Sequence, residues 1–450
     1  MSQHTDDHQA PVPGSSVQTT LARPPKSAGF VIILCFVAIV FDGYDLVVYG
    51  TIVPSLLAYE EWGLTAVETG AYGSYALAGM FFGAILVGYI TDVVGRRKVL
   101  LWSLTAFSLL MVCSALAPNP TVFGVTRFLA GLGLGGVIPT AIAVTVEFSK
   151  PHRRNFNNAA MFSGYAFGGI MASLLAMVLL EHIGFRGMLA IGGLPVLMVV
   201  PLIYFWMPES PAYLRVRGRH EEAARIVEDY GLSTTDTTID EEGSRKGAPT
   251  GRLRTLLTGR WLLATVLFCV AGIAGQTLVY GLNTWMTQLL SMAGYSLTSS
   301  LSFLLTTNIG AVVGVLLSSW LADKYGPRVV TAASFIASGT ALLLMGTGIF
   351  PMIGMYFLVA VVGFGSIGAQ ILVNGFVATF YSDLTRATAL GVTLGVGRIG
   401  AVIAISGGGI LVAASLPTFA NFAVWSLAAL LGVLSVLLVP RRKAGNGTTS

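Results

Sequence analysis

GYITDVVGRRK, at Gly88 to Lys98, and SWLADKYGPR, at Ser319 to Arg328, are two forms of one charged motif, each placed directly after a long apolar stretch. A shift of 231 residues superposes the two forms, including an aspartate, a glycine and an arginine in each. The same shift aligns LVVYG (Leu46 to Gly50) with TLVYG (Thr277 to Gly281). Because one register relates several distant segments, the sequence predicts a chain built from two related halves.

The composition requires a membrane as the surrounding solvent. Hydrophobic residues make up 54% of the 450 residues and charged residues only 10%, whereas a soluble domain has roughly 25% charged residues. So few charges cannot cover the surface of a water-soluble protein of this size. Apolar stretches of about the 20 residues needed to cross a bilayer recur along the chain. We predict twelve transmembrane helices, near residues 29–52, 67–91, 98–117, 121–145, 157–181, 187–207, 260–284, 297–322, 328–349, 352–377, 385–413 and 417–439.

The predicted fold is therefore an all-α membrane protein whose twelve helices form two pseudo-symmetric six-helix halves. The first half covers residues 29–207 and the second covers 260–440. Residues 208–259 form a linker between them, in which GRHEEAARIVEDY (Gly218 to Tyr230) predicts an amphipathic helix. The polar ends, residues 1–28 and 441–450, are predicted to be tails, and the first of them to be disordered.

The distribution of basic residues predicts the orientation of the chain. Of the 26 lysines and arginines, all except Arg127, Arg186 and Arg398 lie in the tails, at the linker or in the even-numbered connections. These segments share one side of the membrane, and basic connections stay in the cytoplasm. Both termini and the linker are therefore predicted to be cytoplasmic. This bias explains the net charge of +5 without a nucleic-acid partner.

No metal site or cofactor is predicted. Cys35, Cys113 and Cys269 lie within apolar stretches, which favours buried apolar side chains over disulfides. The five histidines lack the spacing of metal ligands. The sequence also lacks a recognisable nucleophile–base set and a phosphate-binding loop, so an enzyme is the least favoured class. An ion gradient is the predicted energy source.

The repeated motif resembles the loop signature of the major facilitator superfamily, and the resemblance covers residues 29–440. It implies two halves that rock around a central pathway. An aspartate at a helix end can pair with arginines of a neighbouring cytoplasmic loop, and such pairs would break as the halves move. The alternative is that the arginines only orient the chain. The predicted gating residues are Gly88, Asp92, Gly95, Arg96, Arg97, Glu147, Asp323 and Arg328.

Three further stretches narrow the resemblance. RFLAGLGLGG (Arg127 to Gly136) is similar to the fourth span of proton-coupled members, and PESPAYL (Pro208 to Leu214) to the end of the sixth span of solute symporters. FDGYDLVVYG (Phe41 to Gly50) resembles the signature of the aromatic acid:proton symporter family. This resemblance implies a bacterial inner-membrane importer of benzoate-like, hydroxybenzoate-like or gentisate-like acids. We expect the monomer to be the functional unit.

Asp42 and Asp45 lie at membrane depth in the first span, where an ionised side chain costs about 2.5–3.5 kcal/mol to insert. Three residues apart on a helix, they share a face that Tyr49 extends. Burial and a neighbouring like charge both favour the protonated form of a carboxyl group. The pair therefore predicts a proton-coupling site. The alternative is a structural ion pair, for instance with Arg127.

Arg398 in the eleventh span is the first candidate for binding an anionic substrate. Gly391 and Gly395 on its helix face leave room for a ligand, and a guanidinium can bind a carboxylate through two parallel hydrogen bonds. Arg127 is the second candidate, and a structural counter-ion is the alternative for each. Further predicted substrate-binding residues, which could contact the ring and its hydroxyls or could only join helices, are Tyr44, Gln276, Tyr280, Asn283, Asn308, Gln370 and Asn374.

Together these patterns predict a proton-coupled secondary transporter that imports aromatic carboxylic acids by alternating access. Protonation of Asp42 or Asp45 would free an arginine to bind the carboxylate before the halves rock. The expected partners are the small aromatic acid, protons and membrane lipid. A proton-driven exporter, a sugar or polyol symporter and a receptor without transport stay open as alternatives. A neutral sugar, however, gives no role to Arg398.

Overall fold

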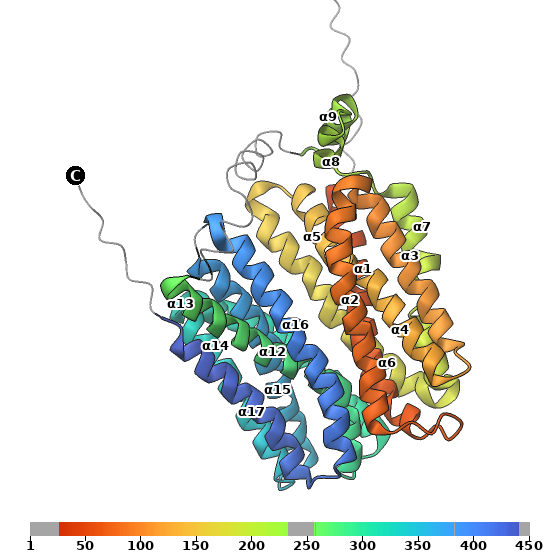
Figure 1. The fold of residues 1–450 in the computed structure, drawn as a ribbon, viewed down its shortest axis with the longest axis vertical. Helices are drawn as coiled ribbons and strands as arrows, with labels where there is room; N and C mark the ends of the chain where they lie inside the picture. The colour runs from red at the N-terminus through yellow and green to blue at the C-terminus, as the bar shows by residue number, and fades with distance from the viewer. Residues whose placement is uncertain (1–26, 233–255, 257, 382, 441–450) are drawn as a thin grey trace, which may run out of the picture.

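A computed structural model describes residues 27–232, 256, 258–381 and 383–440 of the chain. The described part is almost entirely helical, and its long helices form two bundles that stand side by side (Figure 1). The first bundle contains α1 (Ala28–Leu57), α2 (Ala66–Val94), α3 (Arg96–Ala115), α4 (Pro120–Leu134), α5 (Val137–Glu147), the short η1 (Pro151–Arg153), α6 (Arg154–Ile191) and α7 (Pro195–Trp206). The second contains α12 (Gly259–Met292), α13 (Leu297–Tyr325), α14 (Pro327–Gly346), α15 (Met352–Phe380), α16 (Asp383–Ala413) and α17 (Thr418–Leu438).

Two short helices, α8 (Pro211–Val216) and α9 (His220–Asp229), lie at one end of the first bundle (Figure 1). Helix α9 occupies the stretch predicted to form an amphipathic helix, with Ala223 and Val227 buried and Glu221 exposed. The predicted tails fall on residues 1–26 and 441–450, which lie outside the described residues. Most of the predicted linker, at 233–255 and 257, also lies outside them.

Eleven helical segments of the described chain are long and apolar enough to cross a membrane. One of them, Phe156–Trp206, has 51 residues, which is about 75 Å of helix, whereas the apolar core of a bilayer is about 30 Å thick. Gly184 interrupts this segment with a φ of 64°, a left-handed conformation that glycine adopts without strain. The segment therefore supplies two spans, and the predicted fold of twelve transmembrane helices in two halves is confirmed.

Local sequence signals fix the ends of the helices that carry the site. Thr65 caps α2: its hydroxyl accepts from the amide of Glu68 at 3.2 Å, and the Glu68 carboxylate accepts from the Thr65 amide at 2.9 Å. Asn119 caps α4, and Pro120 fills its first position. The fourth span is divided at Gly135 and Gly136 into α4 and α5. These ends set the height of α2 and α4 beside α1.

Three helix pairs join the halves: α1 with α12, α2 with α16 and α6 with α13. Glycines bring the backbones together at three places, where an added Cβ would lie only 1.9 to 2.8 Å from a carbonyl oxygen of the other half. Side chains do not tolerate such distances, so these positions require glycine. We call these contacts the glycine seal; they pair Gly50 with Asn283, Gly70 with Ile405, and Gly409 with Ala66.

The glycine seal lies at the end where the two bundles converge, away from α8 and α9 (Figure 1). Toward the opposite end, Gly391 and Gly395 of α16 have open space where a Cβ would stand. Both share a helix face with Arg398, and the same face continues to Ile405 in the seal. The halves are therefore in close backbone contact at the seal and are less crowded beside Gly391 and Gly395, toward the end that carries α8 and α9, which we call the open end.

Candidate substrate and proton site

Asp42 and Asp45 lie in the middle of α1, where packing against α6 buries them. Only 2% of Asp42 and 4% of Asp45 is exposed. Gly43 lies between them, and a Cβ at this position would come within 2.0 Å of the carbonyl oxygen of Tyr165 in α6. The close approach fixes the rotation of α1. Because the helix backbone is hydrogen-bonded within itself, the two carboxylates depend on side chains of other helices for donors.

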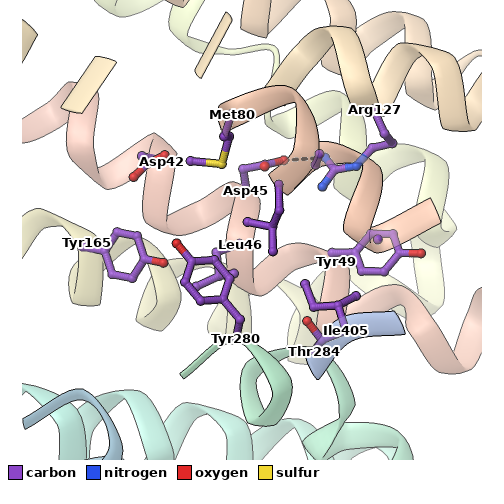
Figure 2. A pocket seen from close by; sticks show the side chains of 13 residues that line it. Asp42, Asp45, Leu46, Tyr49, Met80, Arg127, Tyr165, Tyr280, Thr284 and Ile405 are labelled. Atoms are coloured by element: carbon purple, nitrogen blue, oxygen red, sulfur yellow. Dashed lines mark hydrogen bonds and ion pairs between the residues drawn. The ribbon is translucent and has the colours of Figure 1, made fainter. Parts of the chain in front are cut away.

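Asp45 is paired with Arg127 of α4 (Figure 2). Nη1 of Arg127 donates to Oδ1 of Asp45 at 2.5 Å and contacts the Sδ of Met111 at 3.2 Å. The guanidinium also lies over the ring of Tyr49, 5.4 Å from its centroid. The Tyr49 hydroxyl in turn donates to the carbonyl of Thr69 at 2.5 Å. The structure thus joins two sequence candidates in the way that the ion-pair alternative describes.

Asp42 lacks a comparable partner. Neither of its carboxylate oxygens accepts a hydrogen bond from a described residue. It lines a cavity together with Asp45 and Arg127 (Figure 2). The opposite charge that acts on it belongs to Arg398 of α16, in the other half. A buried carboxylate without a donor is costly in its ionised form, so this position is suited to hold a proton.

Two tyrosines bring the halves together beside Asp42. Tyr165 comes from α6 and Tyr280 from α12, and Figure 2 shows their hydroxyl groups pointing toward one another. Both are electrostatic neighbours of Asp42 and of Arg398. Tyr280 is a sequence candidate, but Tyr165 is not, and neither is Thr284, which lines the same cavity. No charge or recognised motif marks Tyr165 within the fifth span.

Arg398 of α16 is partly exposed. Its guanidinium forms no hydrogen bond or ion pair with any residue that the structure describes. Gln276 of α12 lies beside this part of α16. Its Cγ is 3.3 Å from where a Cβ of Gly397, the residue before Arg398, would stand. An unpaired arginine in a largely apolar pathway can take up a carboxylate with little competition from the protein.

The amide candidates fall into two groups, and each group is mainly occupied with itself. Asn308 donates to the side chain of Asn283 at 3.2 Å, and Asn283 donates to the carbonyl of Val279 at 2.7 Å. Gln370 donates to Asn374 at 3.5 Å, but its Oε1 is buried without a donor. Interhelical bonding therefore accounts for the first group, whereas Gln370 keeps one acceptor free.

Tyr44 points away from the cavity. It is fully buried, and its hydroxyl donates to the carbonyl of Met188 at 2.7 Å within the first half. It stands one residue before Asp45, which on a helix is a rotation of about 100° from the carboxylate face. The placement favours a packing role for Tyr44 over substrate contact.

Comparisons with known proteins agree with this architecture. The model of the Major Facilitator Superfamily matches residues 35–404. The chain belongs to this superfamily. It is 35% identical to the benzoate transport protein of Acinetobacter baylyi, over 92% of this chain and 90% of that protein. It is 37% identical to the gentisate transporter of Corynebacterium glutamicum, over 90% of this chain and 85% of that protein. The expected class, a transporter and not an enzyme, is therefore confirmed.

A solved structure of the same superfamily has the same fold. A partially occluded, inward-open conformation of the xylose transporter XylE from Escherichia coli superposes with a TM-score of 0.75, at 18% identity, over 92% of this chain and 98% of that one. At this identity the likeness concerns the fold alone.

The superfamily loop motif forms a charged network between the first half and the start of the linker. The Nε atom of Arg96 lies 2.6 Å from Oε1 of Glu147, and the Ser210 hydroxyl donates to the same carboxylate. The amide of Arg97 donates to Oε1 of Glu209 at 3.1 Å. Gly95 has a φ of 103° and lies against Glu209, where a Cβ would come within 2.6 Å of the carboxylate. We call these contacts the loop network.

The loop-network contacts of Gly95, Arg96, Arg97 and Glu147 thus run between α3, α5 and the segment before α8 in this conformation. In the second half, Asp323 is exposed, and Arg328 donates to the carbonyl of Leu437. Gly88 and Asp92 lie in α2, but their surroundings are not described. A role of these residues in gating stays a prediction. The loop network itself joins α3, α5 and the start of α8.

Proposed function

We propose that this transporter imports small aromatic carboxylic acids, of the benzoate and gentisate type, together with protons. Two relatives at 35% and 37% identity are named for the transport of such acids. The observation that supports this proposal most strongly is a pair of charged groups that form no hydrogen bond or ion pair with the described residues. Asp42 in the first half and Arg398 in the second act on one another across the interface of the halves.

This arrangement supports a specific order of events. While Asp42 is ionised, its negative charge attracts Arg398 and competes with any other anion for the guanidinium. A proton on Asp42 removes that competition, so that the guanidinium is free for the carboxylate of the substrate. Coupling then arises because the protonated state has the higher substrate affinity. The ion pair with Arg127 engages Asp45, whereas Asp42 has no such partner, which supports Asp42 as the group that carries the proton.

We propose further that the open end of the pathway faces the cytoplasm of a bacterial cell. The loop network and the helices α8 and α9 lie at this end, and the basic connections favour a cytoplasmic position. Both termini would then be cytoplasmic, and the protein would stand in the inner membrane, surrounded by lipid. A monomer with a proton gradient as its energy source, without a cofactor, is sufficient for this cycle.

The test is uptake of radiolabelled benzoate, gentisate and xylose into energised membrane vesicles, with and without a protonophore. We expect uptake of the two aromatic acids, its loss with the protonophore, and no uptake of xylose. Accumulation of xylose would favour the sugar symporter. Extrusion of the acids when the proton gradient is imposed inward would favour the exporter. Binding without flux would favour a receptor.

A further inference from the structure

Tyr165 and Tyr280 are placed where the two halves of the site meet. Tyr165 belongs to the half that carries Asp42, and Tyr280 to the half that carries Arg398. Both line the cavity, both are partly exposed, and their hydroxyls face one another (Figure 2). Each is an electrostatic neighbour of both charged groups. The two phenols therefore come from opposite halves and lie in the electrostatic surroundings of both the carboxylate and the guanidinium.

Several other polar groups of the cavity already have a partner. Asp45 is paired with Arg127, and the Tyr49 hydroxyl donates to the carbonyl of Thr69. Among the described cavity residues this leaves the two phenols and Thr284 as hydroxyl donors. A phenol donates one hydrogen bond, and a carboxylate can accept about four. Arg398 can supply two of these, so a bound acid would need further donors.

We propose that Tyr165 and Tyr280 form a hydroxyl clasp that donates to the carboxylate of the substrate beside Arg398. The inference rests on the proposed function. The clasp takes one donor from each half, so the bound carboxylate joins the halves at the level of Asp42. Because both phenols are electrostatic neighbours of Asp42, the same hydroxyls would also be donors for its ionised carboxylate. Substrate and ionised Asp42 thus compete for the same donors, which gives protonation of Asp42 a second route to raise substrate affinity.

The clasp is distinguished from two other roles that tyrosines at this place could have. If the phenols read a hydroxyl on the aromatic ring, their removal would affect gentisate and spare benzoate, because only gentisate carries ring hydroxyls. If they only pack the helices, removal of the hydroxyl would change the amount of folded protein and the maximal rate, and would leave KM unchanged. A clasp on the carboxylate affects the KM of both acids alike.

The experiment compares Tyr165→Phe and Tyr280→Phe with wild type, using initial uptake rates for benzoate and gentisate and counterflow in de-energised vesicles. Each variant should raise KM for both acids by about tenfold or more, because each loses a hydrogen bond to a charged group. Tyr356→Phe is the matched control, since the Tyr356 hydroxyl contacts Ser302 away from the cavity. Its KM should stay within about twofold of wild type, as a surface-like change would.

The outcomes separate the two proposals. Unchanged KM in both tyrosine variants, with normal wild-type uptake, would overturn the clasp and leave the proposed function intact. A rise in KM confined to gentisate would also overturn the clasp, and would indicate that the phenols bind the ring hydroxyls of the substrate. Absence of aromatic acid uptake by the wild type would overturn the proposed function and the clasp together.

Discussion

At the scale of single residues, Asp42 and Asp45 show how three positions along a helix separate two chemically identical groups. Asp45 meets Arg127 at 2.5 Å, whereas the oxygens of Asp42 have no described donor. An ion pair stabilises the charged form, and an apolar surrounding disfavours it. The two carboxylates are therefore expected to respond differently to the same substitution.

Asp42→Asn should uncouple transport from the proton gradient. The amide imitates the protonated carboxyl group in shape and charge, so substrate binding persists while proton movement is lost. We expect gradient-driven accumulation to fall on the order of 100-fold, with counterflow in de-energised vesicles retained. Parallel measurements of accumulation and counterflow check this. Loss of both, in a variant that reaches the membrane in normal amounts, would contradict a role confined to the proton.

Arg127→Gln and Asp45→Asn should each destabilise the protein by about 3–5 kcal/mol, because each leaves an unpaired buried charge. The double variant removes both charges, and should be less destabilised than the two single effects combined. Thermal unfolding of purified protein in detergent measures the three variants. Additive losses would show that the two groups do not depend on one another, which would contradict the pairing.

At the scale of helices, the glycine seal determines which end of the pathway is closed. Gly50→Ala places a methyl group against the backbone of Asn283, where a Cβ would lie 1.9 Å from the carbonyl oxygen. Overpacking of this kind costs about 1–3 kcal/mol, so α1 and α12 must separate. We expect the sealed conformation to lose population and the uptake rate to fall about tenfold.

Gly407→Ala is the matched control for the seal. Gly407 lies in α16 only two residues before Gly409, but open space surrounds the position of its Cβ. This variant should transport at nearly the wild-type rate. Equal losses of transport rate in the two alanine variants would show that replacing any glycine of these helices has the effect, and that contact between the halves is not its cause.

The loop network makes a separate prediction for the other end of the helices. Glu147→Gln weakens the contacts with Arg96 in the first half and with Ser210 at the start of the linker. We expect the free energy of unfolding to fall by about 1–3 kcal/mol, with KM for the substrate unchanged. Thermal unfolding and uptake kinetics measure the two quantities. Glu221→Gln on exposed α9 serves as the control, and a raised KM for Glu147→Gln would place that residue in the substrate pathway instead.

At the scale of the whole molecule, the sequence predicts the fold almost completely, because the bilayer imposes one length and one polarity on every span. The fifth and sixth spans are the instructive case. Hydropathy predicts two helices near 157–181 and 187–207, and the structure shows one apolar segment that turns at Gly184. The turn depends on the backbone conformation of one glycine. The pattern of apolar residues predicts the two flanking helices but not that conformation.

The site is predicted less completely, since it depends on which helix faces meet. The sequence selects Asp42, Asp45, Arg127 and Arg398 as charges at membrane depth, but 82 positions separate the ion pair, so the choice of partner needs the packing of α1 against α4. Helical geometry does contain one unused signal. Tyr44 stands off the face of the carboxylates, and its position in the sequence already indicates a packing role.

The conformation of the whole molecule can be tested by labelling from either side of the membrane. Gly395→Cys, made in a variant without Cys35, Cys113 and Cys269, should react with a membrane-impermeant maleimide from the cytoplasmic side, because open space adjoins this position. Benzoate should slow the reaction. Labelling from the outside alone would contradict the proposed orientation of the open end.

The chemistry of the glycine seal has one more consequence. Its contacts consist of main-chain oxygens against glycines, and no ion pair in the described part of the chain spans these three places. When the halves separate at the glycine seal, no ion pair has to be broken and rehydrated there. We therefore expect separation of the halves at the seal to proceed equally well at low and at high ionic strength.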